Sequence, residues 1–335
     1  MKVITQPAAS VYQTCFNRII ERIDEEKESL DNRELLEICR PAGDFLRAGG
    51  NTAGDANAHF AHEIAEAALN FLILTKYARP ALRDENPAQF VREHLKPLAS
   101  RLPTQTWRSR EQIGWQQFST PPVVSYLLTY LVNLQKGEQV LEPSAGTGGL
   151  AVWSAGGGFQ TQTNEIDSRR RNLLRQIGFA PTAFDAEFIN DFLPPETEID
   201  CALMNPPFSS NGERTKNNSS KYGFRHVESA LERLKKGGKF GIILGEAAGL
   251  DTKTGQEFWR RLADRIEIKT IIKINGREYY KNGTTVDINL ITGSKLIEAS
   301  KLDWNEQMNK IVCLRAESVE EAFNQTQKLN LRFNQ

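Results

Sequence analysis

Residues 140–150 decide the fold, because they combine a buried strand, a glycine-rich turn and the start of a helix. They read Val140-Leu141-Glu142-Pro143-Ser144-Ala145-Gly146-Thr147-Gly148-Gly149-Leu150. Glycines let a backbone approach a ligand closely, and the free N–H groups of a helix start favour an anionic group. The stretch therefore predicts an α/β fold that binds a ligand at this turn.

An acidic residue follows the turn at a spacing that suits a ribose. Glu165, in Asn164-Glu165-Ile166-Asp167, comes about 20 residues later, as expected of a carboxylate that binds ribose hydroxyls. A dinucleotide site is the alternative, but the fingerprint G-x-G-x-x-G is absent because the glycines fall at 146, 148 and 149. A nucleoside ligand without pyrophosphate fits better, and S-adenosylmethionine is such a ligand. Its carboxylate would bind the amide-rich turn and its ribose would bind Glu165.

A second motif ends the apolar run 199–204 and reads Asn205-Pro206-Pro207-Phe208. Each proline fixes φ at about −65° and restricts the residue before it. The Asn205 side-chain oxygen and the Pro206 carbonyl are therefore rigid acceptors, and both suit one NH2 group. Phe208 offers a flat face to a base, worth about 1–3 kcal/mol. The alternative is a strand that ends in a proline turn over a core phenylalanine.

The order of these motifs resembles the gamma class of S-adenosylmethionine-dependent amino-methyltransferases. In that class a methionine-contacting segment, here 116–122, precedes the glycine turn, and the Asn-Pro-Pro-aromatic motif comes last. More narrowly, the chain is similar to the strawberry notch-like methyltransferase domains of phage- and plasmid-type proteins, through residues 104–109 and 280–287. The likeness covers roughly residues 51–295.

The resemblance implies a Rossmann-like seven-stranded methyltransferase sheet and methyl transfer from S-adenosylmethionine to the N6 amine of adenine in DNA. The target base would be flipped into the Asn-Pro-Pro-Phe pocket. Catalytic roles are implied for Asn205, Pro206, Pro207 and Phe208. Cofactor contacts are implied for Phe118, Thr120, Pro121, Glu142, Ser144, Gly146, Thr147, Gly148, Glu165, Asp191 and Phe192.

Composition and charge limit the location and the partners. No apolar stretch reaches the roughly 20 residues of a membrane span, and the N-terminus lacks a signal-peptide block, so a cytoplasmic protein without membrane contact is expected. Four scattered cysteines without C-x-x-C spacing indicate reduced thiols. DNA is the expected partner, although 42 basic residues only balance 42 acidic ones. Target recognition would then come from the N-terminal helices, from loops or from a protein partner.

The chain divides into three expected parts, a helical region at 1–105, a methyltransferase domain at 106–296 and a strand–helix extension at 297–335. In the first part, helices are expected at 9–39, 56–77 and 87–100. In the second, strands alternate with helices, which predicts a parallel sheet covered on both faces. These strands are expected at 138–141, 160–166, within 182–189, up to Asn205, and at 239–244, 268–274 and 286–292. A helix at 168–177 would be capped by Ser168 and stopped at Gly178. In the extension, a strand is expected at 310–314, followed by a helix that opens with the capping box Ser318-Val319-Glu320-Glu321.

Three groups of polar residues allow more than one interpretation. His59, His62 and Glu63 have a spacing that a metal site uses, but no catalytic motif accompanies them and a polar helix face is favoured. For Arg169, Arg170, Arg171 and Arg175 a solvated helix face is favoured over phosphate binding. The loop residues Arg214, Lys216 and Lys221 suit either solvent or a nucleic-acid strand. Tyr279 or Tyr280 would stack against the substrate base or pack in the core.

Other activities stay open. The same motif serves guanine N2 or adenine N6 methylation of RNA and glutamine methylation of proteins. A subunit of a larger DNA-processing or defence assembly that binds the cofactor without turnover is a second alternative. Dinucleotide-dependent oxidoreduction ranks last, because no hydride-handling residues accompany the fold.

Overall fold

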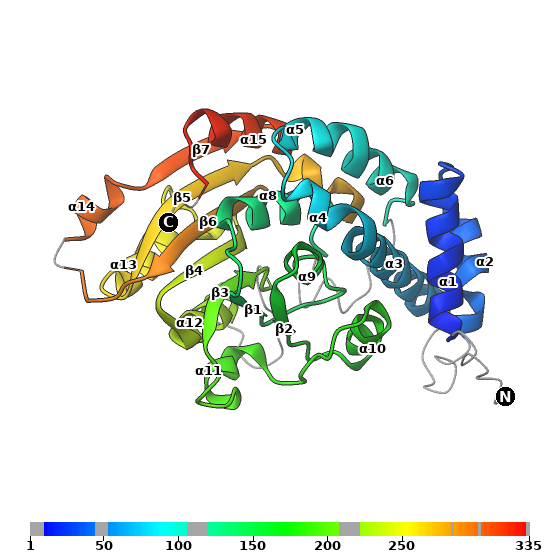
Figure 1. The fold of residues 1–335 in the computed structure, drawn as a ribbon, viewed down its shortest axis with the longest axis horizontal. Coiled ribbons are helices and arrows are strands. Elements are labelled where there is room, and N and C mark those ends of the chain that lie inside the picture. Colours follow the sequence, from blue (N-terminus) through cyan, green and yellow to red (C-terminus); the bar gives the residue numbers. More distant parts are fainter. Residues whose placement is uncertain are drawn as a thin grey trace.

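The computed structural model describes residues 10–43, 53–105, 119–207, 222–282, 285–300 and 303–332, with side chains masked at 53–58 and 222. Seven strands form one mixed sheet in the order β2-β1-β3-β4-β6-β5-β7 (Figure 1). Within this sheet only β6 is antiparallel to its neighbours. The strands are β1 (Gln139–Glu142), β2 (Gln160–Thr163), β3 (Ile199–Met204), β4 (Leu234–Gly245), β5 (Ile266–Ile274), β6 (Ile288–Lys295) and β7 (Val312–Ala316). The predicted α/β fold with a seven-stranded sheet is confirmed.

The seventh strand is not the one that the sequence suggests. The segment expected to hold a short strand, 182–189, contributes only an isolated bridge between Asn164 and Thr182. Asp185 then accepts a hydrogen bond from Glu187 N (3.0 Å) and starts the 3-10 turn η5 (Ala186–Phe188), which ends the extended conformation. The strand expected in the C-terminal extension instead joins the sheet as β7, parallel to β5.

Helices cover both faces of the sheet. One face contacts α8 (Pro122–Val132), α9 (Ala151–Gly157) and α15 (Val319–Lys328), and the other contacts α12 (Tyr222–Arg233). Alternation along the strands divides the core accordingly, since Val140 and Ile243 belong to the first cluster and Leu141 and Ile242 to the second. Phe258 and Trp259 of α13 (Lys253–Leu262) add to the second cluster.

The N-terminal helices share the first of these cores. They are α1 (Val11–Ile20), continued by the π turn η1 (Glu21–Glu25), then α2 (Asn32–Gly43), α3 (Ala53–Leu72), η3 (Ile73–Tyr77), α4 (Ala78–Ala81), α5 (Pro87–Phe90), η4 (Val91–Leu95) and α6 (Lys96–Arg101). Their buried side chains form one continuous cluster with α8, α9 and the sheet. The expected single helix at 9–39 is wrong, because Asp31 caps a new one by accepting from Glu34 N (2.8 Å) while Glu34 accepts from Asp31 N (3.1 Å).

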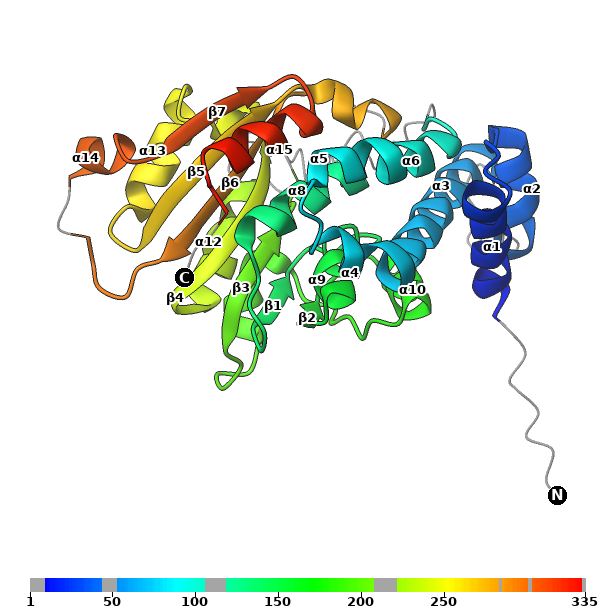
Figure 2. The same ribbon diagram turned by 45° about the horizontal axis from the view of Figure 1, so that its top comes forward.

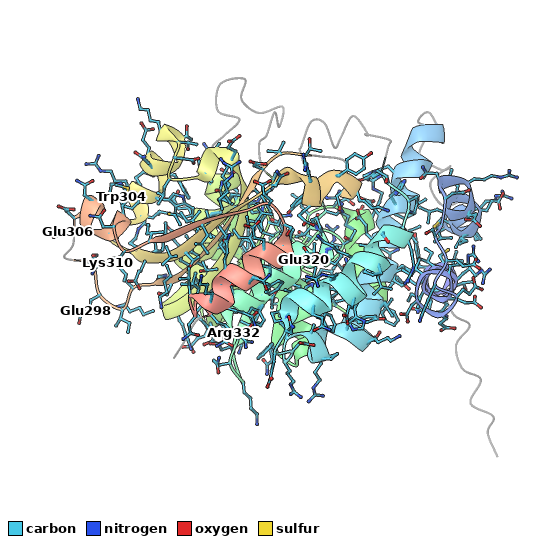
Figure 3. All side chains as sticks on the ribbon, turned by 90° about the horizontal axis from the view of Figure 1, so that it is seen from above. Glu298, Trp304, Glu306, Lys310, Glu320 and Arg332 are labelled. Carbon is cyan, nitrogen blue, oxygen red and sulfur yellow. The ribbon has the colours of Figure 1, made fainter. Side chains whose placement is uncertain are left out.

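The C-terminal elements contact α6 and α8. Ser318 caps α15 by accepting from Glu321 N (3.2 Å), as its sequence predicts. Figure 3 marks Glu320 on α15, where it pairs with Lys96 of α6 (2.7 Å), and Arg332, whose guanidinium lies 4.2 Å from the ring of Tyr130. Trp304, in α14 (Trp304–Met308), and Lys310, two residues after this helix, lie at the end of the molecule opposite the N-terminal helices (Figure 3). No helix in the described ranges has both the length and the apolar character needed to cross a membrane.

Candidate active site

Two predicted motifs meet at one edge of the sheet. β1 and β3 are parallel neighbours (Figure 2), with Leu141 paired to Ala202. The glycine turn after β1 and Asn205 after β3 therefore leave the sheet at the same edge. Carboxyl ends of parallel strands are where ligands bind in open α/β sheets. The turn and the Asn-Pro-Pro corner are therefore placed to act on one ligand.

The glycine turn adopts the left-handed conformation that its sequence allows. Gly146 has φ of 55° and Gly148 has φ of 92°, values that other residues rarely adopt. Glu142, which is buried, accepts a hydrogen bond from Ala151 N at the start of α9 (2.7 Å). Burial raises the pKa of Glu142 well above its usual range, although hydrogen bonds from the backbone of Ala151 and Leu150 favour its charged form.

Asn164 and Glu165 hold the turn from the neighbouring strand. The Glu165 oxygens accept from Gly146 N (2.7 Å) and Asp167 N (2.8 Å), and burial raises the pKa of this carboxyl. The Asn164 side chain makes four hydrogen bonds. Its NH2 group donates to the carbonyls of Pro143 and Phe184 (both 2.9 Å). Its oxygen accepts from Thr182 Oγ1 (2.7 Å) and Phe184 N (2.8 Å). The Glu165 carboxylate thus already accepts from two backbone amides near the turn. An anionic ligand would bind other N–H groups of the turn.

The Asn-Pro-Pro corner is fixed on two sides. Asn205 Nδ2 donates to Thr120 Oγ1 (2.8 Å), which makes the side-chain oxygen the atom with which Asn205 can accept from an amine. Behind the corner, a Cβ built on Gly223 would lie 2.4 Å from the Pro207 carbonyl oxygen, so only glycine allows α12 to start this close. Pro206 and Pro207 are buried. The predicted site residues Phe118 and Phe208, and the loop cations Arg214, Lys216 and Lys221, lie outside the described residues.

Exposed side chains flank the turn. Asp191 and Phe192 lie on α11 (Ile189–Phe192), where Phe192 is 50% exposed and stacks on Phe184 with ring centroids 5.1 Å apart. Ile166, directly after Glu165, is 57% exposed. Ser144 lies 3.3 Å from Nδ1 of the buried His226, whose pKa burial lowers to about 4. Acid, aromatic and aliphatic groups around a glycine turn fit the ribose and base of a nucleoside.

Thr120 and the N-terminal helices complete the site from a third direction. Thr120 contacts the turn, since a Cβ built on Gly149 would lie 3.4 Å from Thr120 Cβ. Asn70 of α3, which is buried, donates to the Thr147 carbonyl (2.8 Å). The sequence analysis missed Asn70, Asn164, Ile166 and His226. An amide within the Ala- and Leu-rich second half of α3 was a signal for Asn70, whereas the partners of Asn164 lie in two separate segments, at 143 and 182–184, and leave no local signal.

Arg170, which was expected on a solvated helix face, instead contacts the polar residues of α3, whereas Arg175 is exposed as predicted. His59, His62 and Glu63 are buried, and Arg170 Nε donates to Glu63 Oε1 (2.7 Å) across the contact between α3 and α10 (Ser168–Ile177). Burial raises the pKa of Glu63, but the charges and hydrogen bonds of Arg170 and His59 together outweigh burial and lower the pKa to about 2. Asp167, and not Ser168, caps α10, while Gly178 ends it as predicted. Tyr279 is buried in the core and Tyr280 is 61% exposed.

No family model matches the chain. Among solved structures, a modification subunit of a putative type I restriction enzyme from Vibrio vulnificus YJ016 is 16% identical, with a TM-score of 0.49, over 74% of this chain and 58% of that subunit. A putative class I S-adenosylmethionine-dependent methyltransferase from Listeria monocytogenes is 14% identical, with a TM-score of 0.48, over 96% of both chains. A putative RNA methyltransferase from Pyrococcus horikoshii is 18% identical, with a TM-score of 0.44, over 62% of this chain and 99% of that one.

The present chain thus spans little more than half the length of the Vibrio subunit. At these identities and TM-scores the similarities are too distant to assign an activity or a substrate to the chain.

Proposed function

We propose that this chain transfers a methyl group from S-adenosylmethionine to the N6 amine of adenine in DNA. The observation that carries the proposal is the meeting of the glycine turn and the Asn205 corner at one sheet edge, joined through Thr120. An amino-methyltransferase site has two halves. One is a turn that binds a nucleoside, and the other is a side-chain amide that accepts a hydrogen bond from the substrate amine. Neither half alone would distinguish this chemistry from simple nucleotide binding.

The residues around the turn would hold the cofactor. Thr120 and Pro121 would contact its methionine end, with Glu142, Ser144, Gly146, Thr147 and Gly148 around it. The Glu165 carboxylate would accept from the ribose and share its lone pairs with Gly146 N and Asp167 N, since a carboxylate has about four acceptor positions. Asp191 would accept from the adenine amine beside Phe192. When bound, the cofactor supplies an electrophilic methyl group on a sulfonium.

The corner would orient the substrate nitrogen. Asn205 Oδ1 and the Pro206 carbonyl would each accept one hydrogen from the amine, which directs the nitrogen lone pair at the methyl group. Thr120 and Gly223 hold the corner before substrate arrives, and such preorganisation of two reacting groups contributes up to about 7–11 kcal/mol to catalysis. Phe208 would stack on the base. The exposed Tyr280 would contact the nucleic acid from η8 (Gly276–Asn282), which follows β5.

DNA is the substrate that we propose, with a base flipped or already unstacked because its amine is out of reach inside a duplex. Neutral overall charge suggests that sequence recognition comes from a protein partner rather than from this chain alone. The narrower relation to strawberry notch-like domains stays a prediction, since no protein named above is one.

Incubation with tritiated S-adenosylmethionine and separate DNA, RNA and protein acceptors tests the proposal. Label recovered as N6-methyl-2′-deoxyadenosine after digestion of the DNA to nucleosides is the expected result. Label in RNA or in glutamine would assign the same site to the other polymer. Cofactor binding with no label in any acceptor, including single-stranded DNA, would indicate a non-catalytic subunit.

A further inference from the structure

A pocket of about 60 Å³ lies between the N-terminal helices and the proposed active site. Residues of α3, α6, η8, the segment at 119–122 and the glycine turn line it. Its polar lining includes Glu66, Asn70, Ser119, Thr120, Thr147 and Lys281. The Lys281 ammonium donates to the carbonyls of Ser100 and Leu102. A buried water needs about 10–15 Å³, so the pocket has room for a small polar group but not for a nucleobase.

The pocket adjoins the catalytic corner through one shared side chain. Thr120 lines the pocket and also accepts from Asn205 Nδ2 (2.8 Å). Thr147, in the turn, lines the pocket and is held by Asn70. A group in this pocket would therefore lie one side chain away from the atom that orients the substrate amine.

Two carboxylates one helical turn apart on α3 differ in how their charge is balanced. Glu63 pairs with Arg170 (2.7 Å). Glu66, which faces the pocket, accepts from the Ser119 hydroxyl (2.5 Å), and no cation among the described residues lies within ion-pair distance of it. Burial raises the pKa of Glu66 more than the Ser119 hydroxyl lowers it. A carboxylate in such surroundings gains most from a cationic ligand group.

We infer that α3 closes the amino-acid end of the cofactor site, with the Glu66 carboxylate pairing with the α-ammonium of the bound cofactor. This inference rests on the proposed function. The cofactor has two cationic centres, and the sulfonium must lie at the Asn205 corner with the methyl group. The ammonium, at the end of a short aliphatic chain, is the centre that reaches a pocket beyond Thr120. The hydroxyls of Thr120 and Thr147 remain as donors for the adjoining carboxylate.

Equilibrium binding with three ligands tests this role. S-adenosylhomocysteine has the α-ammonium, its desamino analogue lacks only that group, and 5′-methylthioadenosine lacks the whole amino-acid end. With the wild-type protein we expect the desamino analogue to bind about ten- to a hundredfold more weakly than S-adenosylhomocysteine, as loss of a charge-assisted hydrogen bond predicts. Glu66→Gln should remove most of that difference and leave 5′-methylthioadenosine unaffected.

Two further variants keep the result interpretable. Glu37→Gln makes the same charge change on α2, where Glu37 pairs with the exposed Arg33, and should bind all three ligands as the wild type does. Ala99→Leu keeps Glu66 but fills the pocket from α6, and should weaken S-adenosylhomocysteine without weakening 5′-methylthioadenosine.

The outcomes separate the two proposals. Equal losses for S-adenosylhomocysteine and its desamino analogue in Glu66→Gln would overturn the ammonium contact, as would wild-type affinity of both Glu66→Gln and Ala99→Leu for S-adenosylhomocysteine. A wild-type protein that binds none of the three ligands would instead overturn the proposed cofactor, and with it the inference.

Discussion

Strands β2, β1 and β3 contain four, four and six residues, whereas β4, β6 and β5 contain 12, eight and nine. In the first half, which we call the site half, buried polar side chains bond to backbone groups, as Glu142, Asn164 and Glu165 do. In the second, the ladder half, β6 pairs with long neighbours on both sides through buried isoleucines and leucines. The comparison indicates that a few side chains shape the site, while extended backbone pairing stabilises the rest.

The largest effect is expected at the corner. Asn205→Ala should lower the rate of methyl transfer by about 100- to 1,000-fold, as loss of one preorganised hydrogen-bonding group typically does. Cofactor affinity should stay within about twofold, because this side chain contacts the amine. Tritium transfer and calorimetric binding measure the two quantities. Asn289→Ala removes a buried amide of the ladder half and should keep the rate, and a loss there as large as at Asn205 would contradict the comparison.

Asn164→Ala should have the largest effect on stability. It removes the partner of four buried or half-buried groups around the turn, so the free energy of unfolding should fall by about 2–4 kcal/mol. Urea unfolding gives the value. A loss below about 0.5 kcal/mol, the range of an ordinary surface substitution, would show that the turn holds its shape without this residue.

A pH effect should also originate in the site half. Burial lowers the pKa of His226 from 6.5 to about 4, so between these values the unfolded chain binds more protons and stability falls as the pH falls. The slope is at most about 1.4 kcal/mol per pH unit for one histidine. His226→Gln should flatten the dependence over this window in urea unfolding at several pH values. Burial also lowers the pKa of His62 to about 4, so an unchanged slope would assign the dependence to other groups such as His62 and not to His226.

The smallest effect should come from the ladder half. Ile243→Val removes one methyl group from a fully buried side chain of β4 and should cost about 0.5–1.5 kcal/mol of unfolding free energy. Methyl transfer at saturating cofactor should be unchanged. A rate that fell together with stability would mean that the two halves are not separable.

The sequence predicted the elements whose signals are local. The central strand before Asn205, the glycine that ends α10 and the cap of α15 all depend on neighbouring residues. The break before α2 was missed although Asp31 and Glu34 form a capping box, because neither glycine nor proline marks it. The prediction of a short strand at 182–189 was wrong because Asp185 starts a 3-10 turn there.

The site was predicted in part for the same reason. The order of the strands along the sequence was enough to predict that the glycine turn and the Asn-Pro-Pro corner lie at the same edge of the sheet. Arg170 was assigned to solvent because its ion pair with Glu63 joins segments 107 residues apart. Contacts of this kind follow from the packing of α3 on α10, which no local pattern encodes.

The continuous core beneath α1–α6 has a practical meaning for protein engineering. Removing the first hundred residues would expose the apolar surfaces of α8 and α9 to solvent and would promote aggregation. Chimeric enzymes that exchange only the glycine turn and the Asn-Pro-Pro corner should therefore carry their own N-terminal helices with them.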